Sequence, residues 1–80
     1  MMNVQAIRQI HNQIRPLTGF TAGLRNGGDH WRLRCNRPDF FNSYFVLEVT
    51  EPGQWAVTES NNIKDAELAD LTNRLKVILN

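Results

Sequence analysis

The side chains that could carry out nucleophilic chemistry are one cysteine and two histidines. Cys35 is the only thiol, and His11 and His30 are the only imidazoles. A cysteine nucleophile needs a histidine base within hydrogen-bond reach. Alternation along the predicted strands points Cys35 toward the core and His30 away from it, whereas His11 lies on the apolar side of a helix. We therefore expect Cys35 to be a buried small hydrophobe, and the sequence predicts no catalytic residue and no enzymatic activity.

Metal and nucleotide sites need defined spacings of ligands or glycines, and these spacings are not found. Cys35, the two histidines and Asp29 do not stand at the separations typical of metal ligands. The segment Asn26-Gly27-Gly28-Asp29 is rich in glycine, but it leads into a strand and not into the helix N-terminus that binds phosphate groups. We interpret it as a hairpin turn, and we expect no metal and no cofactor.

Charge is unevenly distributed along the chain, although the net charge is only +1. Residues 1–37 hold six arginines and one acidic residue, whereas residues 38–80 hold three basic and seven acidic residues. Such a polarity can serve docking to a partner, but we expect the two halves to pair across the folded domain. A net charge near zero gives little general attraction to nucleic acid or to a membrane surface.

Three further features restrict the class of protein. A single cysteine allows no intramolecular disulfide, which is typical of a reducing compartment. No run of about 18 apolar residues occurs, so no membrane span is predicted. The first residues lack the basic and apolar pattern of a signal peptide. We expect a cytoplasmic protein that forms one domain over residues 1–80.

Two amphipathic helices are predicted, one near each end of the chain. Apolar residues at helical spacing predict a first helix that begins after Asn3. This helix is expected to end at Pro16, because proline has no N–H and disfavours helical geometry in the residue before it. A second helix is expected to begin near Asn62, with Asp65 three positions later as in a capping box.

The segment between the helices predicts four strands. A hairpin is expected over residues 18–35, a third strand over residues 43–50 and a short fourth strand around Trp55 and Val57. Short turns favour a meander. The sequence therefore predicts an α+β two-layer sandwich of order α-β-β-β-β-α, with a four-stranded antiparallel sheet and both helices on one face.

Gly27-Gly28 sets the expected register of the first hairpin, because two glycines suit a primed two-residue loop. On the core face this loop pairs Leu24 with Trp31, Ala22 with Leu33, and Phe20 with Cys35. A shift of the pairing by one residue would turn these side chains toward solvent.

The face of the sheet away from the helices, called the outer face, is the first candidate binding surface. Its predicted residues are Arg25, His30, Arg32, Arg34, Tyr44 and Val46. Arginine contacts phosphate groups and tyrosine stacks on bases, so this set is typical of a sheet that binds single-stranded nucleic acid. Arginine and tyrosine are also favoured in protein interfaces. A third interpretation is a solvated face, on which the arginines pair with Glu48 and cover apolar surface with their stems.

The second candidate surface is the Phe40-Phe41 pair in the connection before the third strand. Such a pair either docks a partner or caps the open end of the core, and capping is the commoner arrangement. Together the residues favour a small non-enzymatic protein-interaction module. We expect a protein partner, no membrane, and a monomer or weak homodimer. Weak binding of single-stranded nucleic acid on the outer face is the alternative.

Overall fold

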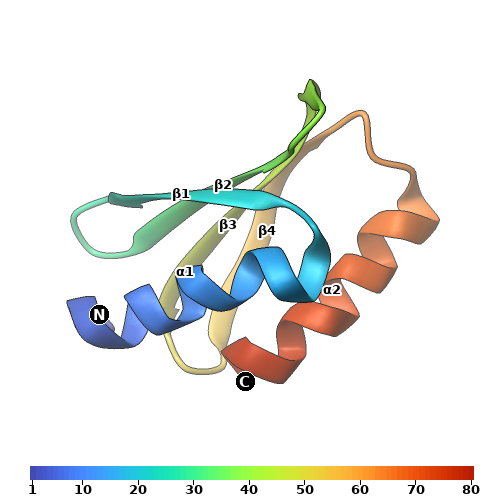
Figure 1. Cartoon of the computed structure of the whole chain (residues 1–80). Coiled ribbons are helices and arrows are strands. Elements are labelled where there is room, and N and C mark those ends of the chain that lie inside the picture. Colours follow the sequence, from blue (N-terminus) through green and yellow to red (C-terminus); the bar gives the residue numbers. More distant parts are fainter.

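The structure, a computed structural model, describes residues 1–80 and contains two helices and four strands (Figure 1). Their order is α1 (Val4–Thr18), β1 (Thr21–Asn26), β2 (Trp31–Arg37), β3 (Phe40–Glu51), β4 (Gln54–Asn61) and α2 (Asp65–Leu79). The strands form one antiparallel sheet in the order β1-β2-β3-β4. The predicted α+β class and the meander are therefore confirmed.

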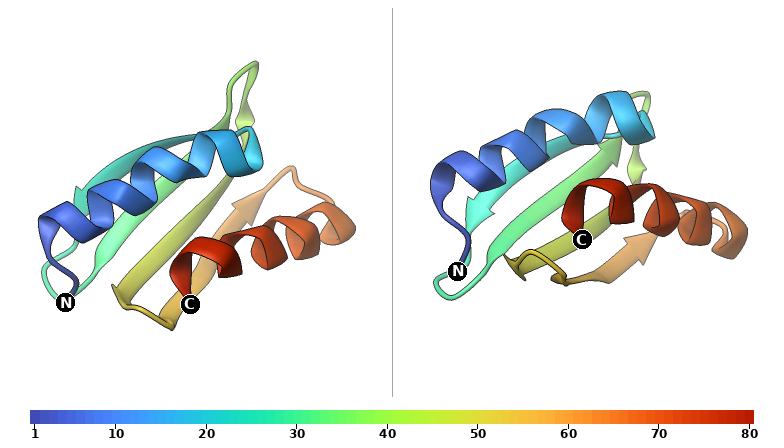
Figure 2. Two further views of the ribbon diagram at one scale, coloured as in Figure 1. Left: turned by 60° about the horizontal axis from the view of Figure 1, so that its bottom comes forward. Right: turned by 90° about the horizontal axis from the view of Figure 1, so that it is seen from below.

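Both helices lie on the same side of the sheet, as the view from below shows (Figure 2). The core between the two layers combines one stripe of each helix with alternate residues of the strands. Its fully or nearly buried members include Ile7, Ile10, Ile14, Phe20, Trp31, Leu33, Cys35, Phe45, Leu47, Val49, Leu71, Leu75 and Leu79. Neither helix is long and apolar enough to cross a membrane. The sheet consequently has one covered face and one outer face.

The register of β1 and β2 differs by two residues from the prediction. Leu24 lies opposite Leu33, and Ala22 lies opposite Cys35. The three predicted pairs are therefore wrong, namely Leu24 with Trp31, Ala22 with Leu33, and Phe20 with Cys35. Because the side chains of a strand alternate with a period of two, this shift leaves every residue on its predicted face.

A longer turn than expected causes the shift. The last pair of the hairpin is Asn26 with Trp31, so four residues form the loop where two were predicted. The Gly27 N–H donates to the His30 carbonyl at 2.8 Å, and the Asn26 side chain accepts from the Gly28 N–H at 2.8 Å. Gly28 has a φ of 95°, a conformation that favours glycine.

The first helix does not end at Pro16 as predicted. It continues to Thr18 and ends at Gly19, whose φ is 80° and whose N–H donates to the Arg15 carbonyl at 2.8 Å. A proline in the last turn removes the N–H that would donate to the Asn12 carbonyl. Asn12 is exposed, so water can satisfy that carbonyl, and the helix tolerates the proline.

The two helix starts differ in how well the sequence predicts them. Asn3 is the N-cap of α1, and its side chain accepts from the Ala6 N–H at 2.8 Å. The predicted start of the second helix near Asn62 is wrong, because α2 begins at Asp65 after Lys64, which makes no side-chain cap. Asn62 instead has a φ of 53°, a left-handed conformation that cannot belong to the helix.

Replacing Pro16 with alanine should stabilise the protein. The restored N–H can donate to the Asn12 carbonyl, so we expect the free energy of unfolding in denaturant to rise by about 1–2 kcal/mol. Gly19→Ala is the control with the opposite sign and should cost about 1 kcal/mol, since a side chain is strained at that left-handed position. A Pro16→Ala protein less stable than wild type would contradict the account of this last turn.

Candidate functional site

The polar side chains of the outer face form a connected row of ion pairs and hydrogen bonds. Glu48 of β3 accepts from Arg32 at 3.2 Å and lies 3.3 Å from the His30 ring. Glu59 of β4 lies 3.9 Å from Arg32 and accepts from the Tyr44 hydroxyl at 2.6 Å. Basic groups from the first half of the chain therefore pair with acidic groups from the second half, as the charge distribution predicted.

Val46 lies on this outer face, but it is not exposed. Its cross-strand neighbours are Arg34 on β2 and Glu59 on β4, and only 1% of its surface is accessible. Long charged side chains can cover apolar surface with their stems while their charged ends stay in water. The expectation that Val46 would be a surface contact is wrong for this reason.

The ring of Tyr44 is occupied by a neighbouring side chain. The Arg34 guanidinium lies 3.9 Å from the ring centroid, a cation–π contact. The hydroxyl at the other end of the ring is held by Glu59, and this hydrogen bond raises the pKa of Tyr44. A base that stacked on Tyr44 would first have to displace Arg34.

His30 is held between two carboxylates. Its Nδ1 lies 2.7 Å from Asp29, and its Nε2 lies 3.3 Å from Glu48. A ring with an acceptor at each nitrogen favours the doubly protonated form, and the pKa of His30 is raised, chiefly through the hydrogen bond to Asp29. The ring also packs over Gly27, where a Cβ would lie 2.6 Å from Nε2. Two carboxylates therefore hold the His30 ring in place and favour its protonated form.

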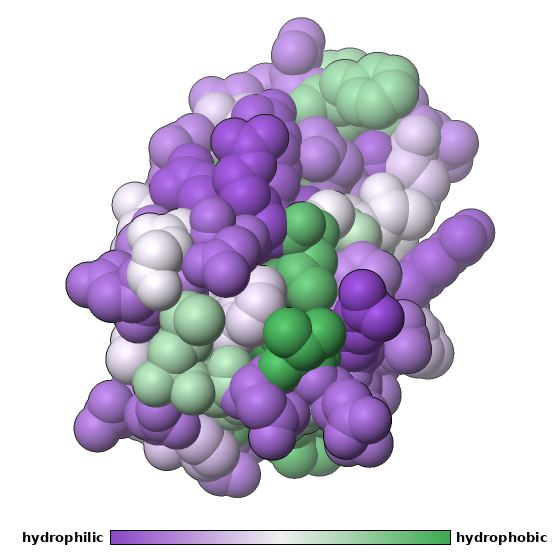
Figure 3. All heavy atoms as spheres, turned by 90° about the vertical axis from the view of Figure 1, so that its left-hand side faces the viewer, coloured by the Kyte–Doolittle hydropathy of each residue, from purple (hydrophilic) through white to green (hydrophobic).

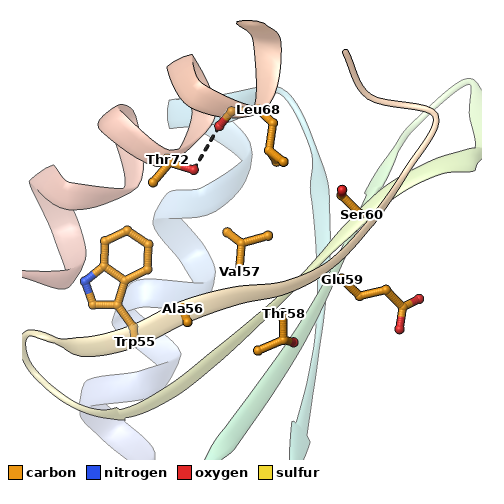
Figure 4. A pocket seen from close by; sticks show the side chains of 8 residues that line it. All are labelled: Trp55, Ala56, Val57, Thr58, Glu59, Ser60, Leu68 and Thr72. Atoms are coloured by element: carbon orange, nitrogen blue, oxygen red, sulfur yellow. Dashed lines mark hydrogen bonds between the residues drawn. The ribbon is translucent and has the colours of Figure 1, made fainter. Parts of the chain in front are cut away.

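A bulge in β4 turns Glu59 toward the outer face. Val46 pairs with Glu59 but Leu47 pairs with Val57, so Thr58 is an extra residue in β4. Strict alternation from the inward-facing Val57 would point Glu59 into the core. In Figure 4 Thr58 and Glu59 both point away from α2. Sequence reasoning missed Glu59, and the signal available was a carboxylate at a position that alternation assigns to the core.

A groove lies between β4 and α2 on the opposite side of the sheet. Trp55 and Val57 point from β4 toward Leu68 and Thr72 of α2 (Figure 4). The groove has a volume of about 490 Å³. The Thr72 hydroxyl donates to the Leu68 carbonyl at 2.8 Å. The predicted short fourth strand is eight residues long, and it forms an edge of the sheet beside this groove.

The Phe40-Phe41 pair lies at the tip of the β2–β3 hairpin, called the Phe40–Phe41 tip. Phe40 is 54% exposed and Phe41 is 81% exposed. The expectation that this pair would cap the core is therefore wrong. In Figure 3 an apolar patch stands among hydrophilic atoms at the top of the molecule, where Figure 1 shows the hairpin tip. The third strand begins at Phe40 and not at residue 43, which carries the pair beyond the core.

Three asparagine side chains from two segments hold the backbone of this tip. The Asn36 amide donates to the Phe41 carbonyl at 3.2 Å. The amides of Asn61 and Asn62 both donate to the Asn42 carbonyl, at 2.6 and 3.0 Å. The tip therefore combines a restrained backbone with two exposed rings.

Arg37, which pairs with Phe40 at the turn end of the β2–β3 hairpin, links the hairpin to the second helix. Its guanidinium donates twice to the Glu67 carboxylate, at 2.7 and 3.1 Å, and this pairing lowers the pKa of Glu67. Its Nε donates to the buried Ser43 hydroxyl at 3.0 Å, which in turn donates to the Asn62 carbonyl at 2.9 Å. The guanidinium also lies 4.7 Å from the ring of Phe20. No sequence motif singled out Arg37, because its partners lie on separate elements.

Cys35 forms no hydrogen bond with either histidine. It is fully buried in the covered face, and burial raises its pKa to about 12. His30 lies on the loop side of the outer face, and the Nε2 of His11 lies 2.6 Å from the Ala22 carbonyl. No group of three or more His, Cys, Asp or Glu side chains lies close enough to hold a metal ion.

Comparison with known proteins identifies no relative. No family model matches the chain, and no curated protein and no solved structure is significantly similar to it.

Native Cys35 should react slowly with thiol reagents. The thiolate is the reactive form, and a pKa near 12 leaves almost none of it at neutral pH. We expect labelling by a maleimide or an aromatic disulfide to follow the fraction of unfolded protein and to become fast in denaturant. Rapid labelling of the folded protein would contradict the buried assignment and would restore the nucleophile interpretation.

Proposed function

We propose that this chain is a small, non-enzymatic, cytoplasmic protein-interaction module that docks through the Phe40–Phe41 tip. One observation carries the proposal, namely two phenylalanines that are 54% and 81% exposed on a backbone held by Asn36, Asn61 and Asn62. Exposed aromatic rings cost solvation free energy in the free protein, and aromatic side chains are favoured anchors in interfaces. A backbone that is ordered before binding loses less entropy on association.

The magnitudes indicate a transient interaction. Burying one phenylalanine contributes about 1.5–3 kcal/mol, whereas association costs about 4–15 kcal/mol of lost translational and rotational freedom. Two rings alone therefore do not give tight binding, and neighbouring surface must contribute. Phe40 shares a shallow hollow with Asn62, Ile63 and Lys64. This hollow would extend the contact toward the start of α2.

The alternative function is weak binding of single-stranded nucleic acid on the outer face. Arg25 and Arg34 support it, because neither forms an ion pair with a carboxylate. The arrangement of Tyr44 argues against it, since Arg34 occupies the ring on which a base would stack. Docking of a protein partner at the Phe40–Phe41 tip is therefore the leading proposal.

The test is capture of partners from the source cell with matched variants. Phe40→Ser with Phe41→Ser should lose the captured protein and leave the unfolding temperature nearly unchanged, because both rings are exposed. Val77→Ser is the control, since Val77 is an apolar residue of α2 that is 75% exposed and lies outside the proposed surface. This control should capture the partner like wild type.

Digestion of nucleic acid before capture separates the two functions. For a protein partner held by the tip, capture should survive digestion and should disappear only in the double phenylalanine variant. Capture that is abolished by digestion, or that is equal in the double variant and in wild type, would contradict the proposal.

A further inference from the structure

A hollow on the outer face lies over β1 and β2. It has a volume of about 390 Å³ and is lined by Gly23, Leu24, Arg25, Arg32, Arg34 and Asn36. Gly23 leaves space in the hollow, because a Cβ placed on it would meet no other atom within 4 Å. Three of the six lining residues are arginines, and none is acidic.

The strand register brings these arginines together. Arg25 on β1 lies directly opposite Arg32 on β2, and Gly23 lies opposite Arg34. Like charges directly opposite each other destabilise an antiparallel pair. The pairing of Arg25 with Arg32 therefore does not stabilise the sheet. An anion bound between the two side chains would reduce their repulsion.

The three guanidinium groups differ in how far their charge is compensated. Arg32 donates to Glu48 at 3.2 Å and lies 3.9 Å from Glu59. Arg34 donates from its Nε to the Asn36 side chain at 3.3 Å and lies 3.9 Å from the centre of the Tyr44 ring, but it has no carboxylate partner. Arg25 has no hydrogen-bond or ion-pair partner. Two arginines without a carboxylate partner thus line one hollow.

We propose that this hollow binds the phosphate group of a small phosphorylated molecule. The planar fork of arginine matches the oxygens of a phosphate or carboxylate group. A carboxylate carries one negative charge and compensates one arginine, whereas a phosphate monoester carries close to two at neutral pH. The pair Arg25 and Arg34 therefore matches the phosphate group better. This site is independent of the Phe40–Phe41 tip.

Gly23→Val is the most direct test, because it fills the hollow without changing any charge. Gly23 lies in a strand without a positive φ, and a β-branched residue suits such a position, so the variant should fold and be at least as stable as wild type. The companion variant is Arg25→Gln. The control is Arg8→Gln, which removes an exposed arginine of α1 and leaves the hollow intact.

The measurement is an NMR titration with inorganic phosphate at constant ionic strength, with acetate as a comparison. Wild type and Arg8→Gln should show the same saturable shifts at residues of β1 and β2, whereas Gly23→Val and Arg25→Gln should each weaken binding by at least about tenfold. Acetate should bind more weakly than phosphate. Equal phosphate affinity in Gly23→Val and wild type, or equal losses in Arg8→Gln and Arg25→Gln, would overturn the proposal in favour of diffuse charge attraction.

Discussion

The constraint on which the structure depends is that two helices cover only one face of a four-stranded sheet. A strand rises about 3.3 Å per residue and a helix about 1.5 Å. The 12 residues of β3 therefore extend past helices of 15 residues each. The outer face and the end of the β2–β3 hairpin are left without a covering layer. The charged and polar groups there must therefore be paired by side chains of the same regions.

The polar groups of these two uncovered regions are paired in different ways. On the outer face Glu48 and Glu59 compensate Arg32, and the charged stems bury Val46. At the Phe40–Phe41 tip the backbone carbonyls are satisfied by asparagine side chains, but the rings stay in water. The outer face thus forms most of its contacts within the chain, whereas the tip has apolar surface left for a partner. The hollow beside Gly23 is lined by two arginines, Arg25 and Arg34, that have no carboxylate partner.

Local patterns in the sequence predicted the fold class, the face of each strand residue around Cys35 and the buried stripes of both helices. They did not predict features that depend on distant partners. The four-residue loop over residues 27–30 shifted the register of β1 and β2 by two residues. Alternation cannot detect such a shift, because it leaves every side chain on the same face. The bulge at Thr58 exposed Glu59, although strict alternation assigned that position to the core. The contacts of Arg37 with Glu67 join elements 30 positions apart, and no spacing rule connects them.

The central claim is that the Phe40–Phe41 tip is ordered in the free protein, and amide relaxation of residues 39–43 by NMR tests it most directly. The asparagine hydrogen bonds and the Arg37–Glu67 pair should restrain these residues as firmly as the centre of the sheet. The account predicts order parameters of about 0.85 for the amides of Phe40, Phe41 and Asn42, like those of β3 as a whole. Values below about 0.6 would show a flexible tip and would contradict the claim.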